Sequence, residues 1–389
     1  MRRGEGVLPR QDLAKLHKDG DISAPSLSEE QLQPASLDLR LDDSAICVSS
    51  SFIPGETESI YETAKRLKTG QLKLSDSETT VLKVGKTYII PLVEDVELKQ
   101  RFHGVINPKS TTGRSDLLTL TLVDGVPVLD TVLPGQRRKM FAEVTPLSFD
   151  IGVRAGLVLN QLRVMRGNSQ LNDASLDMEY QYLGTTLLQN YFGMDIPHKN
   201  ASIKDSGIEI SYDLQSPIVA YEAREDVKQV LDLSAPRGTH LKDLEKFWRI
   251  IERPANGELN LRKDKFYLLA TRERVRLPPH ICGYVDAYDP TTSEGRNQSA
   301  GYLDDGFGYG RRGEIPSSQI TLEKRVHYKQ FRITDGQKVG KVRYHWLLAI
   351  PVDNKGRVAV YGVGIYAGKS NYQRQLNGPM LGKQFLSPN

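Results

Sequence analysis

The sequence predicts a mainly β protein that contains two tandem copies of one domain. The segment 88–104, YIIPLVEDVELKQRFHG, aligns without a gap with the segment 267–283, YLLATRERVRLPPHICG. Identical residues recur at matching places, among them Tyr88 and Tyr267, and further matches downstream keep nearly the same spacing. Because two segments hold nearly one offset, we interpret the sequence as an internal duplication whose second copy begins near residue 200.

Short segments rich in β-branched and aromatic residues fill both copies. They alternate between apolar and polar residues and are separated by turn residues, which is typical of strands. In the first copy they are LLTLTLV, KMFAEVTPLSFDIGV and LVLNQLRVM, and in the second ITLEKRVHYKQFRI, KVGKVRYHWLLAIPV and RVAVYGVGIY. Strands that do not alternate with helices favour a sandwich or a distorted barrel over a doubly wound sheet.

Helices are expected at only a few places. Residues 8–20, LPRQDLAKLHKDG, have helical spacing and a glycine stop. Residues 239–252, THLKDLEKFWRIIE, resemble an amphipathic helix, and 174–192 can hold a third.

Length and repeat together suggest the domain limits. At 389 residues the chain fits two domains, each large enough to bury a core. We expect a first domain at 1–170 with the active site, a connector at 171–200, and a degenerate second domain at 201–389 that carries a closing tail. The polar stretch GNSQLND ends the strands of the first domain.

Composition excludes several classes of protein. Cys47 and Cys282 are the only cysteines, which excludes a disulfide framework and a thiolate-rich metal site. The formal charge of +4 is mild, and the longest apolar run, WLLAIPV, is too short to cross a bilayer. The N-terminus lacks the apolar region of a secretory signal. We therefore expect a cytoplasmic protein with no membrane or nucleic-acid partner.

The sequence also argues against two kinds of site, a dinucleotide-binding loop and a zinc-dependent deaminase centre. GYGRRG at 308–313 matches G-x-G-x-x-G, but Pro316 and turn-forming serines stand where a dinucleotide-binding helix would begin. No H-x-E with a P-C-x-x-C partner occurs, which excludes the zinc-dependent nucleobase deaminases.

The stretch NPKSTTGRSD at 107–116 gathers cations and hydroxyls after the first repeated segment. Such a set suits an anionic ligand, although it also describes an ordinary solvated turn. The aligned stretch of the second copy is DAYDPTTSEG, in which Lys109 faces Tyr288, Ser110 faces Asp289 and Arg114 faces Ser293. Since both copies share the flanking strands, this divergence suggests one working site and one that is lost or repurposed.

These residues carry a family resemblance. KSTTGR at 109–114, LDTVLPG with Asp130, FAEV with Glu143 and VRAGLVLNQLRV at 153–164 resemble the dCTP deaminase branch of the dUTPase-like superfamily. QDLAKLHKDGDI and QPASLDLRL are similar to that family's first helix and strand. The resemblance implies two tandem dUTPase-like domains, each a distorted β-barrel or jelly roll. It also implies zinc-independent hydrolysis of dCTP to dUTP and ammonia, in pyrimidine deoxynucleotide synthesis.

The resemblance assigns catalytic roles to Glu143, Ser110 and Arg114. Deamination needs one group that both takes and gives a proton, and Glu143 has apolar neighbours that suit this role. The alternative for Glu143 is a salt-bridged glutamate at a sheet edge. Ser110 can orient the water or the exocyclic amine, and Arg114 can hold a carboxylate or a carbonyl oxygen through its planar fork.

Further residues are expected to bind the substrate. Lys109 and the backbone amides of 111–113 suit phosphate oxygens, and the resemblance implies that Asp130 accepts the sugar 3′-hydroxyl. The tail GKSNYQ resembles the family's closing segment, which indicates Lys369 and Gln373 and, more weakly, Tyr366; the alternative is a loose polar terminus. The expected substrate-binding set is Lys109, Thr111, Thr112, Gly113, Asp130, Phe141, Gln161, Lys369 and Gln373.

A triphosphate needs its charge neutralised, so we expect Mg²⁺ to arrive with the substrate rather than in a protein cage. Because sites of the family lie between barrels of a trimer, we also expect a homo-oligomer with interdomain or intersubunit sites.

Two departures from the family pattern keep alternatives open. LDTVLPG is two residues longer than the family's D-P-G turn, and the second copy keeps Glu323 without serine and arginine partners. A dUTP pyrophosphatase, a bifunctional deaminase and pyrophosphatase, and a non-enzymatic nucleotide-binding regulator are the competing hypotheses. Analysis of the nucleotide product distinguishes them.

Overall fold

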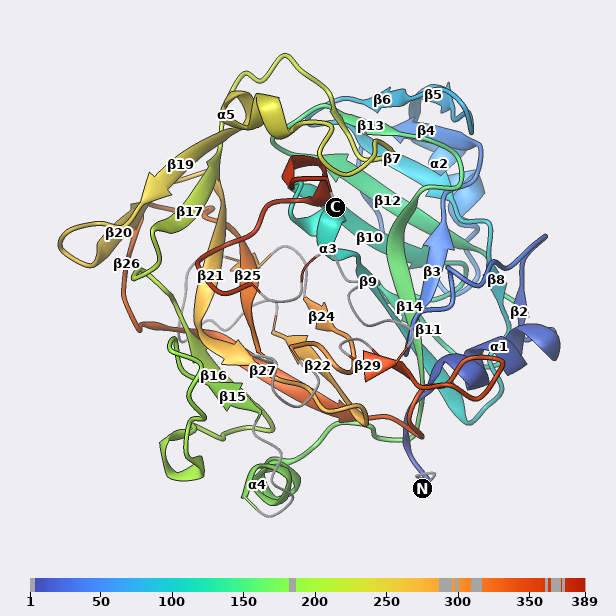
Figure 1. Cartoon of the computed structure of the whole chain (residues 1–389). Coiled ribbons are helices and arrows are strands. Elements are labelled where there is room, and N and C mark those ends of the chain that lie inside the picture. The colour runs from blue at the N-terminus through green and yellow to red at the C-terminus, as the bar shows by residue number, and fades with distance from the viewer. Residues whose placement is uncertain are drawn as a thin grey trace. The chain divides into compact units, whose positions relative to one another are not determined.

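The computed structural model describes residues 4–181, 187–286, 296–297, 301–308, 317–360, 363–364, 372 and 375–388. They form two compact units (Figure 1). The first unit consists of Arg10–Gly167, Glu225–Phe247 and Gly382–Asn389. The second consists of Met1–Pro9, Asn168–Arg224 and Trp248–Leu381. The units thus differ from the contiguous domains expected from the repeat, because two segments from the second half of the chain belong to the first unit.

The first unit is built mainly from strands. Its helices are α1 (Arg10–Lys18), α2 (Ile60–Arg66), α3 (Ser110–Gly113), α5 (Leu244–Phe247) and the short 3-10 helices η2 (Leu241–Asp243) and η3 (Lys383–Phe385). Its strands are β2 (Ile22–Ser23), β3 (Leu37–Arg40), β4 (Ser44–Val48), β5 (Lys68–Lys73), β6 (Thr80–Leu82), β7 (Thr87–Pro91), β8 (Asp95–Val96), β9 (Phe102–Pro108), β10 (Leu117–Val123), β11 (Thr131–Val132), β12 (Met140–Pro146), β13 (Ile151–Val153), β14 (Val158–Arg166) and β18 (Leu231–Asp232).

The second unit has the same character. Its helices are α4 (Asp173–Gln181) and the 3-10 helix η1 (His198–Asn200). Its strands are β1 (Gly6–Val7), β15 (Leu188–Gln189), β16 (Ile208–Ser211), β17 (Ile218–Ala223), β19 (Trp248–Glu252), β20 (Glu258–Leu261), β21 (Phe266–Val275), β22 (Ile281–Val285), β23 (Arg296–Asn297), β24 (Tyr302–Leu303), β25 (Ser318–Arg325), β26 (Phe331–Thr334), β27 (Lys338–Trp346), β28 (Ala359–Val360) and β29 (Val363–Gly364).

Strand order repeats from one unit to the other. One sheet of the first unit runs β10-β12-β7-β4-β5, and its counterpart in the second unit runs β23-β25-β21-β17-β19. A further sheet places β3 beside β14, followed by β9 and β11, and its counterpart runs β16-β27-β22-β24. This correspondence, element by element, is what duplication of one domain produces.

Hydrogen bonds at aligned residues repeat as well. The Lys83 N–H donates to the Tyr88 hydroxyl at 3.1 Å, and the Arg262 N–H donates to the Tyr267 hydroxyl at 2.8 Å. Each tyrosine therefore closes the turn that leads into its own strand, which gives a physical reason for this matching pair in the sequence.

Predicted strands are confirmed in both units. In the first unit 117–123 forms β10, 139–153 contains β12 and β13, and all but the first residue of 157–165 belongs to β14. In the second unit 320–333 overlaps β25 and β26, 338–352 contains β27, and 357–366 contains β28 and β29. Strand β10 begins with alternating buried and half-buried residues, whereas β12 and β14 are buried on both faces and are recognised by their short apolar and β-branched segments.

One helix prediction is partly wrong. Helix α1 lies within the predicted range 8–20, and α4 forms the beginning of the range 174–192, of which residues 182–186 lie outside the described part. The range 239–252, however, contains only η2 and α5 before Trp248–Glu252 forms strand β19, paired with β17. The sequence WRIIE favours a strand because β-branched side chains pack well against a neighbouring strand.

Each unit has its own buried apolar cluster. In the first unit, one cluster contains Ile46, Val48, Ile60, Ala64, Ile89, Leu122 and Phe141. The second unit has a larger cluster that includes Tyr212, Tyr267, Leu269 and Tyr344. Among the described residues, no helix is long and apolar enough to span a membrane.

Candidate active site

Glu143 lies in the middle of the β10-β12-β7 sheet. In the strand register it stands between Leu120 of β10 and Ile89 of β7, and only 4% of the residue is exposed. Phe141, two positions earlier on β12, points to the same face because side chains alternate along a strand. Phe141 and Ile89 belong to the apolar cluster of the first unit, so the carboxylate lies beside a core rather than at a solvated edge.

The segment that follows β4 supplies the polar contacts of Glu143. The Ser51 hydroxyl donates to Glu143 Oε1 at 2.8 Å, and the backbone of Phe52 also forms a hydrogen bond with this carboxylate. Burial raises the pKa of Glu143 above its ordinary value, and the two hydrogen bonds oppose that rise. The expected alternative, a salt-bridged edge glutamate, is wrong, because no ion pair involves Glu143 in the described part of the chain.

Asp130 is a second carboxylate of the same region. It adopts a left-handed backbone conformation, with φ 56°, at the turn before β11, and its Oδ1 accepts the Thr121 N–H at 2.7 Å. Burial raises the pKa of Asp130 to about 7, and the negative charge of Glu143 adds to the rise. Since the charge of Glu143 acts on Asp130, the two carboxylates form one acidic locus.

The stretch 107–116 is a strand end followed by one helical turn, α3. The Thr112 hydroxyl donates a hydrogen bond to the Leu159 carbonyl at 2.9 Å, which fixes the turn. Both Thr112 and Gly113 are buried. Ser110 and Thr111 are half-buried, whereas Arg114 is buried at 6% exposure. The turn is therefore not an ordinary solvated one.

Within the described ranges, neither Ser110 nor Arg114 forms a hydrogen bond or an ion pair with Glu143.

Lys109 is held by an aspartate that the sequence did not single out. Its Nζ donates to both carboxylate oxygens of Asp38, at 2.6 and 2.8 Å. Asp38 belongs to β3, and its neighbour on β14 is Gln161, whose Oε1 accepts the Ser36 hydroxyl at 3.3 Å. Burial raises the pKa of Asp38, while the Lys109 ammonium opposes the rise. Asp38 lies in the stretch QPASLDLRL, which carries part of the family resemblance but was assigned no binding or catalytic role.

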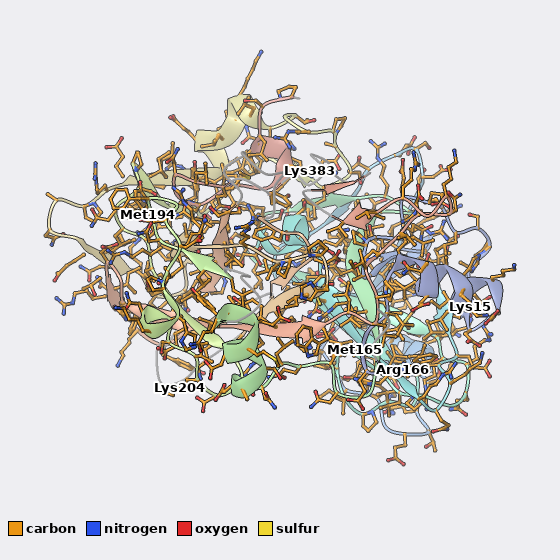
Figure 2. The ribbon with its side chains drawn as sticks, turned by 60° about the horizontal axis from the view of Figure 1, so that its bottom comes forward. Lys15, Met165, Arg166, Met194, Lys204 and Lys383 are labelled. Atoms are coloured by element: carbon orange, nitrogen blue, oxygen red, sulfur yellow. The ribbon has the colours of Figure 1, made fainter. Side chains whose placement is uncertain are left out.

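The C-terminal segment reaches the α3 turn, but through other residues than those predicted. A side-chain atom on Gly382 would lie 3.9 Å from Ser115 Oγ, at the end of that turn. Lys383, labelled in Figure 2, has a pKa lowered by burial and by the nearby charge of Lys109. Lys369, Gln373 and Tyr366 lie outside the described residues. Lys383 escaped prediction because it stands ten positions past the family-like tail motif.

Docking of this segment on the first unit rests on backbone bonds and aromatic rings. The Gly238 N–H donates to the Lys383 carbonyl at 3.1 Å, and the His240 N–H donates to the Gln384 carbonyl at 2.8 Å. Phe385 packs edge-to-face on Phe247, with ring centroids 5.4 Å apart. The segment therefore lies fixed beside α3.

The second unit retains part of the acidic locus. Glu323 of β25 stands opposite Leu268 of β21, just as Glu143 stands opposite Ile89. The place of Asp130 is taken by Gly301: the Val285 N–H donates to the Gly301 carbonyl as the Ile106 N–H donates to that of Asp130. The counterparts of Lys109, Ser110 and Arg114, at 288, 289 and 293, lie outside the described residues. At these two positions the second copy thus keeps the glutamate and has a glycine in place of the aspartate.

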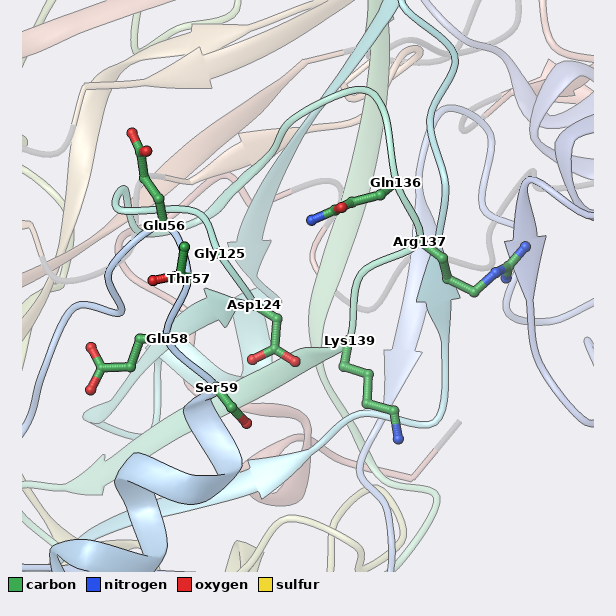
Figure 3. A pocket seen from close by; sticks show the side chains of 9 residues that line it. All are labelled: Glu56, Thr57, Glu58, Ser59, Asp124, Gly125, Gln136, Arg137 and Lys139. Atoms are coloured by element: carbon green, nitrogen blue, oxygen red, sulfur yellow. The ribbon is translucent and has the colours of Figure 1, made fainter.

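A surface cleft of about 390 Å³ lies in the first unit (Figure 3). Glu56, Thr57, Glu58 and Ser59 line one side with Gly125 beside them, Gln136, Arg137 and Lys139 line the other side, and Asp124 lies between the two groups. Two of its carboxylates stabilise local structure. Asp124 Oδ1 accepts the Ile60 N–H at the start of α2 at 2.9 Å, and Glu58 accepts the Gly55 N–H in the loop before that helix at 3.1 Å.

No group of three or more histidine, cysteine, aspartate or glutamate side chains that could hold a metal ion occurs among the described residues. Both cysteines are free thiols.

Fold and site together define a duplicated, mainly β protein whose first copy has a buried glutamate, a half-buried aspartate and a cationic turn. Residues 4–168 match the N-terminal domain of 2′-deoxycytidine 5′-triphosphate deaminase, and residues 188–385 match its C-terminal domain. The chain belongs to the 2′-deoxycytidine 5′-triphosphate deaminase family.

A solved structure supports this assignment. The crystal structure of 2′-deoxycytidine 5′-triphosphate deaminase from Agrobacterium tumefaciens is 30% identical in sequence and superposes with a TM-score of 0.79. The similarity covers 89% of this chain and 100% of that one. No curated protein matches the chain.

Proposed function

We propose that this protein catalyses the hydrolytic deamination of dCTP to dUTP and ammonia, with Glu143 as the group that transfers protons. The observation that carries the assignment of Glu143 is a carboxylate on a central strand, 4% exposed, whose pKa is raised by burial. Membership of the deaminase family and the similarity to the Agrobacterium tumefaciens deaminase support the reaction.

The chemistry needs a group that is basic at one step and acidic at the next. Glu143 removes a proton from water as the water oxygen bonds to C4 of the cytosine ring. That proton passes to N3, and the second water proton leaves with the exocyclic amine as ammonia when the C4–N bond breaks. A carboxyl group with a raised pKa suits both steps, because its two protonation states are then closer in free energy near neutral pH.

Other residues are assigned to binding. Ser110 and Arg114 present a hydroxyl and a guanidinium for the reacting end of the base, and Lys109 presents an ammonium for the phosphates. Asp130 accepts the sugar 3′-hydroxyl. Lys109 is already ion-paired with Asp38, so a triphosphate would compete with that carboxylate for the ammonium. Thr112 and Gly113 would act through the backbone, because their side-chain positions are buried in the turn.

Mg²⁺ is proposed to enter with the triphosphate, whose oxygens are the ligands that this ion prefers. We also propose that each unit is a distorted β-barrel of the dUTPase-like superfamily and that the protein forms a homo-oligomer. In such an assembly Ser110 and Arg114 would meet a glutamate of another copy, which is compatible with their lack of contact with Glu143 in the described residues. Two free thiols fit a reducing, cytoplasmic location.

The test is incubation with dCTP, with and without Mg²⁺, followed by assay of ammonia and chromatography of the nucleotide. Formation of dUTP and one equivalent of ammonia, dependent on Mg²⁺, is the expected result. Release of dUMP and pyrophosphate from added dUTP would instead indicate a bifunctional enzyme. Binding of dCTP without turnover would contradict the proposal.

A further inference from the structure

The two oxygens of Glu143 have different surroundings. Oε1 accepts the Ser51 hydroxyl at 2.8 Å. Oε2 is buried and has no hydrogen-bond partner within the part of the chain that the structure describes. A buried carboxylate oxygen without a partner costs free energy, so this atom is available to a group from outside the described residues.

Ser51 contacts this buried carboxylate from an exposed position. It is exposed and lies in the segment between β4 and α2, whereas Glu143 is a buried residue of a central strand. The neighbouring Phe52 packs against the apolar cluster that contains Ile89 and Phe141. The serine hydroxyl therefore reaches the carboxylate from a segment that is itself fixed to the core by its next residue.

Among the described residues, the charged neighbour of Glu143 is Asp130. The flanking residues Leu120 of β10 and Ile89 of β7 carry no charge, and the segment after β4 contributes Ser51 and the backbone of Phe52. Asp130, from the turn before β11, is the charged neighbour, and its own pKa is raised in part by Glu143. Hydrogen bonds to the carboxylate thus have a direct influence on its proton affinity.

We propose that Ser51 is a positioning residue: its hydroxyl fixes Oε1 of Glu143, so that Oε2 is the oxygen that exchanges protons with water and substrate. The proposal rests on the function proposed above, since it requires Glu143 to be the general base. A carboxylate that is held at one oxygen keeps its other oxygen in a single orientation. Fewer orientations of the carboxylate must then be sampled before the reaction. A charge-assisted hydrogen bond from a hydroxyl is strong enough for this role.

The test compares Ser51→Ala with Ser51→Thr, which keeps the hydroxyl, and with Ser50→Ala, a matched change at the adjacent exposed serine. Loss of the hydroxyl removes a bond that favours the carboxylate, so the pKa of Glu143 rises. The acidic limb of the kcat/KM profile should move up by about one pH unit, since hydrogen bonds to charged groups change equilibria by about tenfold or more. We expect kcat at neutral pH to fall by a similar factor, with KM for dCTP nearly unchanged.

Ser50→Ala should behave as wild type, and Ser51→Thr should recover most of the lost rate and the original pH limb. An unshifted pH profile in Ser51→Ala would overturn the inference, as would a Ser51→Thr variant as impaired as Ser51→Ala. Glu143→Gln measured in parallel separates this failure from that of the proposed function. If Glu143→Gln is inactive while Ser51→Ala is normal, only the inference fails; if Glu143→Gln is active, the proposed function fails with it.

Discussion

Asp130 illustrates how a single residue links conformation, charge and function. Its left-handed backbone, with φ 56°, is a conformation that aspartate and asparagine tolerate better than most side chains. The Thr121 N–H holds its carboxylate at 2.7 Å, yet burial and the charge of Glu143 still raise its pKa to about 7. A carboxyl group perturbed in this way is typical of functional sites.

The raised pKa of Asp130 predicts how stability depends on pH. The folded state binds more protons than the unfolded state between about pH 4 and pH 7, so this residue's contribution to stability is lost as pH rises through that window. Asp130→Asn keeps the amide-accepting oxygen and removes the charge. Denaturant unfolding should show the variant to be more stable than wild type at pH 8 and similar at pH 4. Asp76→Asn, an exposed control, should leave the profile unchanged; equal effects of the two changes would contradict the account.

Lys324 is an ionisable residue of the second unit whose pKa is also shifted by burial. It is fully buried on β25, next to Glu323, at the place that Val144 occupies in the first unit. Its Nζ lies 5.5 Å from the centre of the Tyr212 ring and has no hydrogen-bond partner among the described residues. Burial lowers the pKa of Lys324 to about 7.

Replacement of Lys324 by Met should therefore stabilise the second unit. Between about pH 7 and pH 10 the unfolded state holds a proton that the folded state lacks, so wild-type stability rises with pH across this window. Lys324→Met removes a buried polar group without a partner, and the gain at pH 7 should be about 1–3 kcal/mol. Unfolding curves at pH 7 and pH 10 measure it. Lys263→Met, at an exposed lysine, serves as the control, and a destabilised Lys324→Met variant would show that the ammonium has a stabilising role.

At the scale of elements, the strands were predictable and the long-range packing was not. Short apolar and β-branched segments identify β10, β12 and β14, because this signal is local in sequence. The repeat predicts that Glu143 and Glu323 share a register position. Residues 225–247 and 382–388 pack on the first unit although both segments come from the second half of the sequence. No local periodicity records such packing. The same holds for Ser51, whose contact with Glu143 joins residues that are 92 positions apart.

The C-terminal element should contribute measurably to stability. Phe385 is 3% exposed and lies edge-to-face on Phe247, which in turn lies 5.4 Å from the ring of Phe149. Phe385→Ala removes the central contact of this element and should lower the free energy of unfolding of the first unit by about 3 kcal/mol. Ser387→Ala, at an exposed neighbour, should cost less than about 0.5 kcal/mol. Equal unfolding midpoints for Phe385→Ala and wild type would show that the segment does not dock in solution.

At the scale of the whole molecule, duplication leaves two glutamates at one structural position, and among the described residues only Glu143 has a counterpart of Asp130 beside it. Glu143 has Asp130 beside it, while Gly301 takes the place of that aspartate in the second unit. The turn with Lys109, Ser110 and Arg114 also belongs to the first copy. These differences lead us to place the proton-transferring group in the first unit.

The most direct test of this assignment measures kcat and dCTP affinity for Glu143→Gln and Glu323→Gln side by side. Glutamine keeps the shape and the hydrogen-bond acceptor that Ser51 contacts, but it cannot take up a proton. Glu143→Gln should bind dCTP and lose at least about a hundredfold in kcat, as expected for a general acid–base group, whereas Glu323→Gln should keep most of its turnover. An inactive Glu323→Gln together with an active Glu143→Gln would contradict the account and place the reaction at the other copy.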